Sequence, residues 1–177
     1  MLGMSGTERS FLPLAIAVLT ISDTRTEATD TSGQLLAGRV QAAGHRLLEK
    51  RIVPDDIYRI RAVVSAWIAD ANVNVVVTTG GTGVTGRDGT PEAIQPLLDK
   101  EIQGFGEMFR ALSYEDVKSS TLQSRALAGV ANGTYVFCLP GSNGACALGW
   151  DKLIVHQLDY RTRPCNLVEL MPRLLER

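Results

Sequence analysis

Two short runs of apolar and β-branched residues constrain the fold of this chain most strongly. Leu14 to Ile21 is apolar almost throughout, and Val73 to Thr79 is nearly as apolar. A strand with one face in water alternates apolar and polar residues, whereas a continuous apolar run indicates a strand that is covered on both faces. A weaker strand is predicted between them, from Leu47 to Val53.

Amphipathic helices are predicted between these strands. One begins at Ser32 and ends at Gly44, and the other follows Pro54-Asp55-Asp56 with apolar residues spaced three and four apart. Strand and helix thus alternate, which predicts parallel strands joined by right-handed crossovers, with helices on both faces of the sheet. Because such sheets bind ligands beyond the carboxyl ends of their strands, we expect the functional residues in the loops that begin at Ser22, Pro54 and Gly80.

The second half of the chain predicts an antiparallel addition to this sheet. Asn132-Gly133 is a strong hairpin signal, and it joins two predicted strands, Leu122 to Ala131 and Thr134 to Leu139. We also predict a short helix with Thr90 as its cap and Pro91 as its first residue, a helix through Phe105 to Leu112, a helix from about Ala145 to Val155, and an irregular tail. The expected fold class is therefore α/β, with a mostly parallel sheet, an antiparallel hairpin and helices on both faces. We expect a single domain over residues 1–177, with an ordered core of about 14–166.

Composition and charge limit the partners. The net charge of −1 over 177 residues argues against nucleic acid as the main partner. The apolar run from Phe11 to Ile21 is shorter than the roughly 20 residues that span a bilayer, so no membrane association is expected. Cys138, Cys146 and Cys165 stand far apart and form no C-x-x-C pair, which indicates reduced thiols and a cytoplasmic protein.

The loop after the third predicted strand has the composition of a phosphate-binding loop. Gly80-Gly81-Thr82-Gly83 lets the backbone approach a ligand closely and turn its N–H groups inward, and Thr79 and Thr82 add hydroxyl groups. Asp88, farther along the loop, would repel a phosphate unless a cation lay between them, so it suggests Mg²⁺. The alternative is a flexible turn in which Asp88 only caps a turn or helix.

Two nucleotide-binding motifs overlap this loop without fitting it. Gly81-x-Gly83-x-x-Gly86 matches the dinucleotide fingerprint, but the next helix starts only at Pro91 and the loop follows the third strand rather than the first. Arg87-Asp88 stands where a P-loop has Lys followed by Ser or Thr. A nicotinamide-binding oxidoreductase therefore stays a minor alternative, and no tightly bound redox cofactor is expected.

Three further groups of residues lie at the same predicted edge of the sheet. Asp55 follows the second strand and could share one or two Mg²⁺ ions with Asp88 over a triphosphate, although an aspartate before a helix is ordinarily its cap. Ser22 and Asp23 follow the first strand. Pro140-Gly141-Ser142 precedes a helix whose N-terminus is a candidate anion site, with Ser142 or Asn143 as the alternative cap.

These motifs together resemble those of the molybdenum cofactor biosynthesis proteins MoaB and MogA. The resemblance lies in Thr79 to Gly83, Arg87 to Ala93 and Leu139 to Ser142. Gln103 to Glu107, Ser119 to Ala126 and Leu158 to Asn166 are similar to the MoaB branch. The resemblance extends from about Leu14 to Asn166, nearly the whole chain.

The resemblance implies a three-layer molybdopterin-binding fold and Mg-ATP-dependent adenylylation of molybdopterin. In that reaction the terminal phosphate of molybdopterin attacks the α-phosphorus of ATP and pyrophosphate leaves. Asp55 and Asp88 match the family's acidic positions and would hold Mg²⁺. Thr79, Gly80, Gly81, Thr82 and Gly83 would bind phosphate or pterin, with Ser22, Asp23, Pro140, Gly141 and Ser142 nearby. The family also implies a homotrimer or hexamer and a partner protein that inserts molybdenum. A non-catalytic molybdopterin-binding or assembly protein of the same pathway is the alternative.

Overall fold

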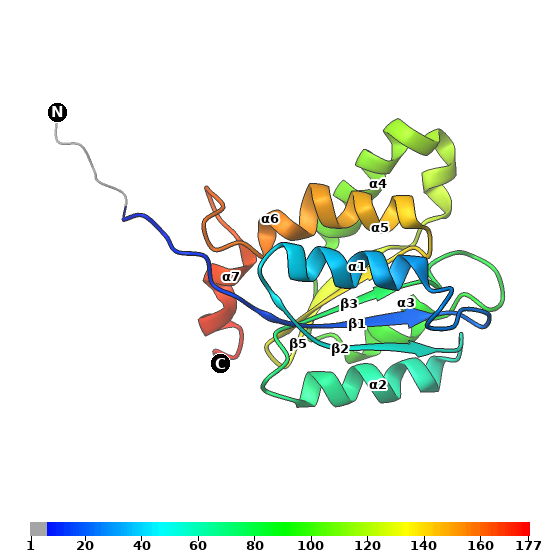
Figure 1. The fold of residues 1–177 in the computed structure, drawn as a ribbon, viewed down its shortest axis with the longest axis horizontal. Coiled ribbons are helices and arrows are strands. Elements are labelled where there is room, and N and C mark those ends of the chain that lie inside the picture. Colours follow the sequence, from blue (N-terminus) through cyan, green and yellow to red (C-terminus); the bar gives the residue numbers. More distant parts are fainter. Residues whose placement is uncertain (1–6) are drawn as a thin grey trace.

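The computed structural model describes residues 7–177 and contains one six-stranded sheet of order β2-β1-β3-β6-β5-β4 (Figure 1). β1, β2, β3 and β6 are parallel, and β5 runs antiparallel to both of its neighbours. The predicted mostly parallel sheet with an antiparallel hairpin is therefore confirmed. The strands are β1 (Ala15–Ile21), β2 (Arg46–Val53), β3 (Val75–Thr79), β4 (Lys100–Glu101), β5 (Leu127–Ala131) and β6 (Thr134–Leu139).

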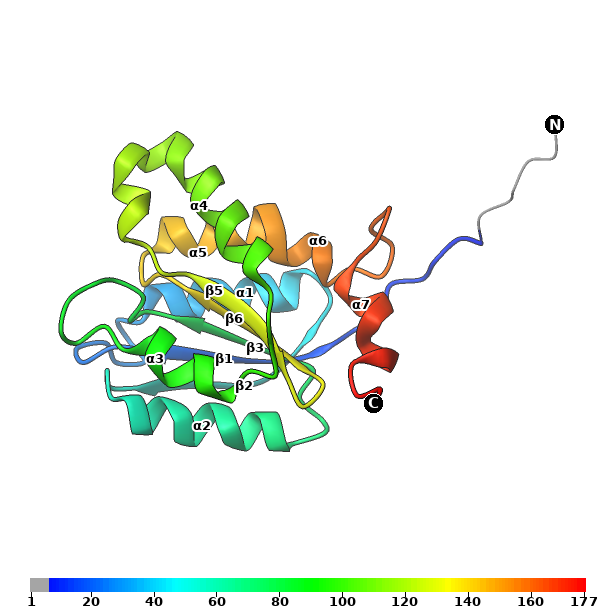
Figure 2. The same cartoon turned by 180° about the vertical axis from the view of Figure 1, so that it is seen from behind.

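Helices cover both faces of the sheet and complete three layers. Figures 1 and 2 show α1, α4, α5 and α6 on one side, and α2 and α3 on the other. The helices are α1 (Thr31–Ala42), α2 (Ile57–Ala69), α3 (Thr90–Ile94), α4 (Gln103–Val117), α5 (Asn143–Gly149), α6 (Val155–Gln157) and α7 (Leu167–Leu170). Short 3₁₀ segments span Gln95–Leu97, Lys118–Gln123 and Met171–Arg173, and a π-helical segment, Trp150–Ile154, joins α5 to α6.

The side chains of β1 explain the two cores. Ile16 and Val18 belong to the core beneath α1 and α4, whereas Ala17 and Leu19 belong to the core beneath α2 and α3. Successive side chains of a strand point to opposite faces, so an apolar run without alternation fills both cores. The continuous apolar pattern thus correctly predicted a strand buried between two helical layers.

Several predicted boundaries are wrong. The strand predicted from Leu122 begins only at Leu127, because Lys118 adopts a φ of 55° after α4 and the chain then forms the 3₁₀ segment Lys118–Gln123. The helix expected at Ser32 begins at Thr31, with Asp30 as its cap. The tail is not irregular throughout, since Asn166 and Glu169 form a capping box at the start of α7. The two-residue strand β4 was not predicted.

The helix that follows Asp88 starts differently from the prediction. Gly89 occupies the cap position and makes no side-chain bond, while Thr90 is the first helical residue and Pro91 lies in the first turn. The Thr90 hydroxyl donates instead to the carbonyl of Gly80, at 2.8 Å. Thr90 therefore fastens the glycine loop and does not cap α3.

Within the described part of the chain, no helix has both the length and the apolar composition needed to cross a membrane.

Candidate functional site

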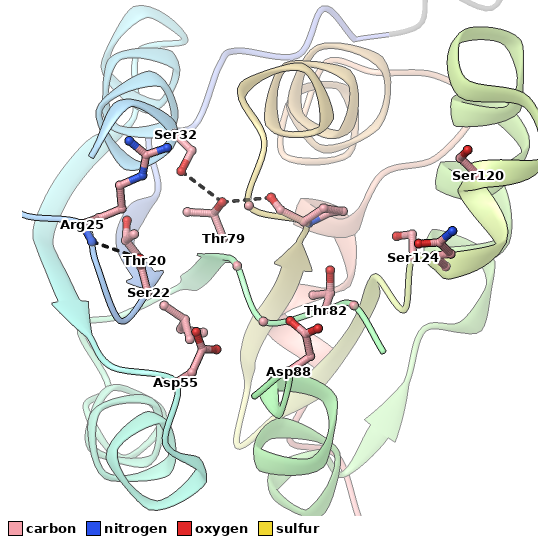
Figure 3. Close-up of a pocket in the computed structure, with 17 residues that line it drawn as sticks. Thr20, Ser22, Arg25, Ser32, Asp55, Thr79, Thr82, Asp88, Ser120 and Ser124 are labelled. Carbon is pink, nitrogen blue, oxygen red and sulfur yellow. Dashed lines mark hydrogen bonds between the residues drawn. The ribbon is translucent and has the colours of Figure 1, made fainter. Parts of the chain in front are cut away.

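A cavity of about 430 Å³ lies beyond the carboxyl ends of β1, β3 and β6 (Figure 3). This is the edge of the sheet where the sequence placed the functional loops. Most of the predicted site residues contribute to its wall, namely Ser22, Asp55, Thr79, Gly80, Gly81, Thr82, Gly83, Asp88, Pro140 and Gly141. The fold thus brings together residues from five separate segments of the chain.

The first two glycines of the loop are required by its backbone. Gly80 has a φ of +104°, and a Cβ there would lie 2.2 Å from the carbonyl oxygen of Ile21. Gly81 has a φ of +70°, and a Cβ there would lie 2.3 Å from the Thr90 hydroxyl. L-residues rarely adopt such φ values, so the loop can make this close turn only with glycine at both positions.

Four consecutive carbonyl groups of the loop are held from one side. The carbonyls of Gly80 and Gly81 accept from the hydroxyl and the N–H of Thr90, at 2.8 and 3.0 Å. The carbonyls of Thr82 and Gly83 accept from the N–H and the Nε of Arg125, at 2.9 and 2.8 Å. In a planar trans peptide the N–H points opposite to the C=O. The N–H groups of Gly81, Thr82 and Gly83, which follow the first three carbonyls, therefore turn away from Thr90 and Arg125, and that of Gly83 points toward the Asp88 carboxylate.

Asp55 is a poorly solvated carboxylate in the wall of this cavity. Its Oδ1 is buried and has no hydrogen-bond partner among the described residues. Burial raises the pKa of Asp55, and the negative charges of Asp23 and Asp88 raise it further. The neighbouring Asp56 caps α2 by accepting from the N–H groups of Tyr58 and Arg59. The capping role considered for this acidic pair thus belongs to Asp56, and Asp55 is left facing the cavity.

Asp88 faces the same cavity from the glycine loop. Its Oδ2 accepts from the N–H and the hydroxyl of Thr85, at 2.9 and 2.7 Å. Burial alone would raise the pKa of Asp88, but these bonds, a bond from the Gly83 N–H and the charge of Arg125 outweigh it and lower the pKa. Asp88 is therefore the more readily ionised of the two carboxyl groups.

The donor set formed by Asp55 and Asp88 fits Mg²⁺ bound together with phosphate. Within residues 7–177 no group of three or more His, Cys, Asp or Glu side chains is placed to hold a metal ion. Mg²⁺ commonly binds through one or two carboxylates and completes its shell with phosphate oxygens and water. The unpartnered oxygen of Asp55 is the kind of hard ligand that such an ion takes.

Two predicted residues lie outside the cavity wall. Asp23 forms a two-bond ion pair with Arg87, at 2.9 and 2.7 Å, and accepts from the Asp55 N–H at 3.0 Å. The hydrogen bond from Arg87 lowers the pKa of Asp23. Ser142 caps α5 by accepting from the Ala145 N–H at 3.1 Å. Asp23 and Ser142 shape the loops around the cavity in this structure without lining it.

Other wall residues were not predicted. Thr20, Arg25 and Ser32 lie beside Ser22, and Ser120, Gln123 and Ser124 come from the 3₁₀ segment after α4 and its end. Figure 3 places Ser120 and Ser124 across the cavity from Ser22 and Asp55. The incorrect strand prediction over this segment placed Gln123 and Ser124 in the sheet rather than at the cavity. In the sequence, Arg125 stands out only as part of the motif from Ser119 to Ala126.

The fold and the cavity define a three-layer α/β protein with a candidate ligand site lined by a glycine loop and two carboxylates. Residues 17–160 match the family model of the probable molybdopterin binding domain. The chain belongs to this family, within its MoaB branch of molybdenum cofactor biosynthesis proteins. The resemblance found in the sequence is thereby confirmed.

The relatives cover most of the chain. Molybdenum cofactor biosynthesis protein B of Escherichia coli (strain K12) is 55% identical over 163 residues, 92% of this chain and 96% of that protein. The Bacillus cereus protein of the same name is 51% identical over 146 residues, 82% of this chain and 86% of that protein. A crystal structure of molybdenum cofactor biosynthesis protein B matches with a TM-score of 0.82 at 48% identity, covering 85% of this chain and 94% of that one. The tungsten cofactor synthesizing protein MoaB from Pyrococcus furiosus matches with a TM-score of 0.70 at 40% identity, covering 80% and 91%.

Proposed function

We propose that this protein catalyses the Mg-ATP-dependent adenylylation of molybdopterin. The observation that carries the proposal is the meeting of Asp55, Asp88 and the glycine-loop amides in one cavity. The amides suit phosphate oxygens, and the two carboxylates suit the cation that accompanies a nucleoside triphosphate. Membership of the molybdopterin-binding family supports the identity of the second substrate.

The reaction transfers the adenylyl group of ATP by substitution at its α-phosphorus. An oxygen of the terminal phosphate of molybdopterin forms a bond to the α-phosphorus of ATP while the bond between the α-phosphorus and the bridging oxygen breaks. The products are adenylylated molybdopterin and pyrophosphate, which carries away the electron pair of the broken bond. The attacking phosphate is already ionised at neutral pH, so no general base is needed, and positioning and charge stabilisation account for the rate.

The residues of the cavity have different roles in this reaction. The loop amides of Gly81 and Thr82 would bind phosphate oxygens, and Asp55 and Asp88 would hold Mg²⁺. Bound Mg²⁺ would neutralise charge on the phosphates and on the leaving pyrophosphate. Ser120, Gln123 and Ser124 supply hydroxyl and amide groups on the opposite wall, where they orient the uncharged part of a substrate.

The decisive experiment is pyrophosphate release from ATP and Mg²⁺, with and without molybdopterin. We expect release only when molybdopterin is present and Asp88 is intact. If the protein binds molybdopterin but releases no pyrophosphate, the non-catalytic alternative replaces this proposal. We also expect a homotrimer or hexamer that passes its product to a molybdenum-insertion partner, and light scattering on the purified protein tests the oligomeric state.

A further inference from the structure

Arg125 lies outside the cavity but contacts the glycine loop at three carbonyl groups. Its N–H donates to Thr82 at 2.9 Å, its Nε to Gly83 at 2.8 Å and its Nη2 to Asp88 at 3.1 Å. Gly83 and Asp88 flank residues 84–87, which are all exposed. The guanidinium therefore spans the neck of this exposed turn and fixes the separation of its two ends.

Glu92 holds the Arg125 guanidinium in place. Both of its carboxylate oxygens accept from Arg125, and this hydrogen bonding lowers the pKa of Glu92. The side chains are 34% and 49% exposed, and ion pairs this exposed contribute little stability by charge alone. The pair instead fixes the position of two segments relative to each other, because Glu92 belongs to the first turn of α3 and Arg125 directly follows Ser124 of the opposite cavity wall.

The position of Asp88 depends on the peptide groups that Arg125 orients. With the Thr82 carbonyl turned toward Arg125, the Gly83 N–H points to the other side, toward the Asp88 carboxylate, where it helps to lower the pKa of Asp88. Gly83 also lies so close that a Cβ there would be 2.6 Å from the Asp88 Oδ2. A displacement of Gly83 must therefore displace the Asp88 carboxylate.

We propose that Arg125 is a positioning residue that fixes Asp88 and the loop amides in their ligand-binding arrangement. The planar guanidinium reaches two carbonyls and a carboxylate at once through a fixed set of donors, which the single ammonium of a lysine cannot reproduce. The expected loss of pyrophosphate release rests on the adenylyl transfer proposed above, whereas the expected loosening of the loop does not.

Arg61 offers a matched control. It lies on α2 and holds the same short helix α3 by donating to the carbonyls of Ala93 and Glu92 at 3.1 and 2.8 Å, and within residues 7–177 it makes no hydrogen bond to the loop. Arg61→Lys therefore loosens α3 without touching the glycine loop. Comparison with Arg125→Lys separates general loosening of α3 from loss of loop positioning.

The experiment uses the full-length chain and three readouts. ATP binding with Mg²⁺ is measured by titration calorimetry, pyrophosphate release by a coupled assay, and hydrogen exchange of residues 80–90 by mass spectrometry. For Arg125→Lys we expect at least about tenfold weaker ATP binding and roughly 10²-fold slower release, since small misplacements cost this much, together with faster exchange in the loop. Arg61→Lys should stay close to the wild-type protein in all three.

The outcomes separate this proposal from the proposed function. A wild-type protein that binds ATP but releases no pyrophosphate in the presence of molybdopterin would refute the adenylyltransferase, while ATP binding and hydrogen exchange would still test the role of Arg125. Wild-type exchange and affinity in Arg125→Lys would overturn the positioning role, and so would equal losses in Arg61→Lys. Arg125→Gln, which keeps donors but loses the charge, serves as the second variant if Arg125→Lys fails to fold.

Discussion

Replacing Gly80 with alanine tests whether the glycine loop has the backbone described above. The φ of +104° is strained for any residue with a Cβ, which costs about 1–3 kcal/mol. The new Cβ would also lie 2.2 Å from the backbone oxygen of Ile21, which cannot rotate away, and such overpacking costs a further ~1–3 kcal/mol. We therefore expect Gly80→Ala to lower the free energy of unfolding by about 3 kcal/mol from these two costs.

Gly86 provides the control for this substitution. It lies in the same loop without a positive φ, and a Cβ there would meet no atom within 4 Å. Gly86→Ala should therefore change the free energy of unfolding by less than about 0.5 kcal/mol. Urea titrations at one protein concentration, followed by fluorescence and circular dichroism, measure both variants. Equal stability of Gly80→Ala and Gly86→Ala would mean that the loop does not pass under Ile21 in this conformation.

Three further substitutions test the carboxylates. Asp55→Asn should abolish pyrophosphate release and should stabilise the fold at pH 7. Because the pKa of Asp55 is raised in the folded protein, the stability contribution of this carboxyl group is present below the ordinary aspartate pKa and is lost as the pH rises through the folded-state pKa. The stability gained by Asp55→Asn should therefore shrink in urea titrations at lower pH. Asp88→Asn should keep the far-ultraviolet circular dichroism spectrum and lower turnover at least about 10²-fold, because a metal ligand is lost; unchanged turnover would make Asp88 a turn residue only. Lys50→Met should lower the free energy of unfolding by about 3 kcal/mol in the same titration, because it leaves the fully buried Asp30 without its cation, and a loss under about 1 kcal/mol would contradict the buried pairing.

The sequence predicted the parts of the fold that depend on local patterns. The apolar spacing of α2, the buried strands β1 and β3, and the Asn132-Gly133 hairpin are all set by residues close together in the chain. The segment from Lys118 to Gln123 depends instead on Arg110. The Arg110 carbonyl accepts a hydrogen bond from the Thr121 hydroxyl, and the Arg110 guanidinium donates to the carbonyls of Ser124 and Ala126. No periodicity reveals such contacts, so the strand was predicted to begin too early.

The same distinction applies to the candidate site. The glycine loop and Asp88 are recognisable because close approach and charge demand particular residue types at short spacing. The sequence leaves Asp55 as either a cap of the following helix or a site residue, and only the structure shows that Asp56 caps α2. Arg125 contacts a loop that is distant in sequence, and its contacts with that loop are to backbone carbonyls, which leave no pattern in the sequence.

The β3–β6 pairing bears on how the protein folds. It joins the βαβαβ half of the chain to the hairpin half, with Val75 beside Tyr135 and Thr79 beside Leu139. The Thr79 hydroxyl also bonds the Pro140 carbonyl at 2.9 Å, so the floor of the cavity exists only after this pair has formed. Contacts between distant residues form slowly because a long loop must be closed first. A nascent chain therefore contains Asp55, Asp88 and the glycine loop before it contains Arg125 and β6, and the cavity takes its final form only when the last strands join the sheet.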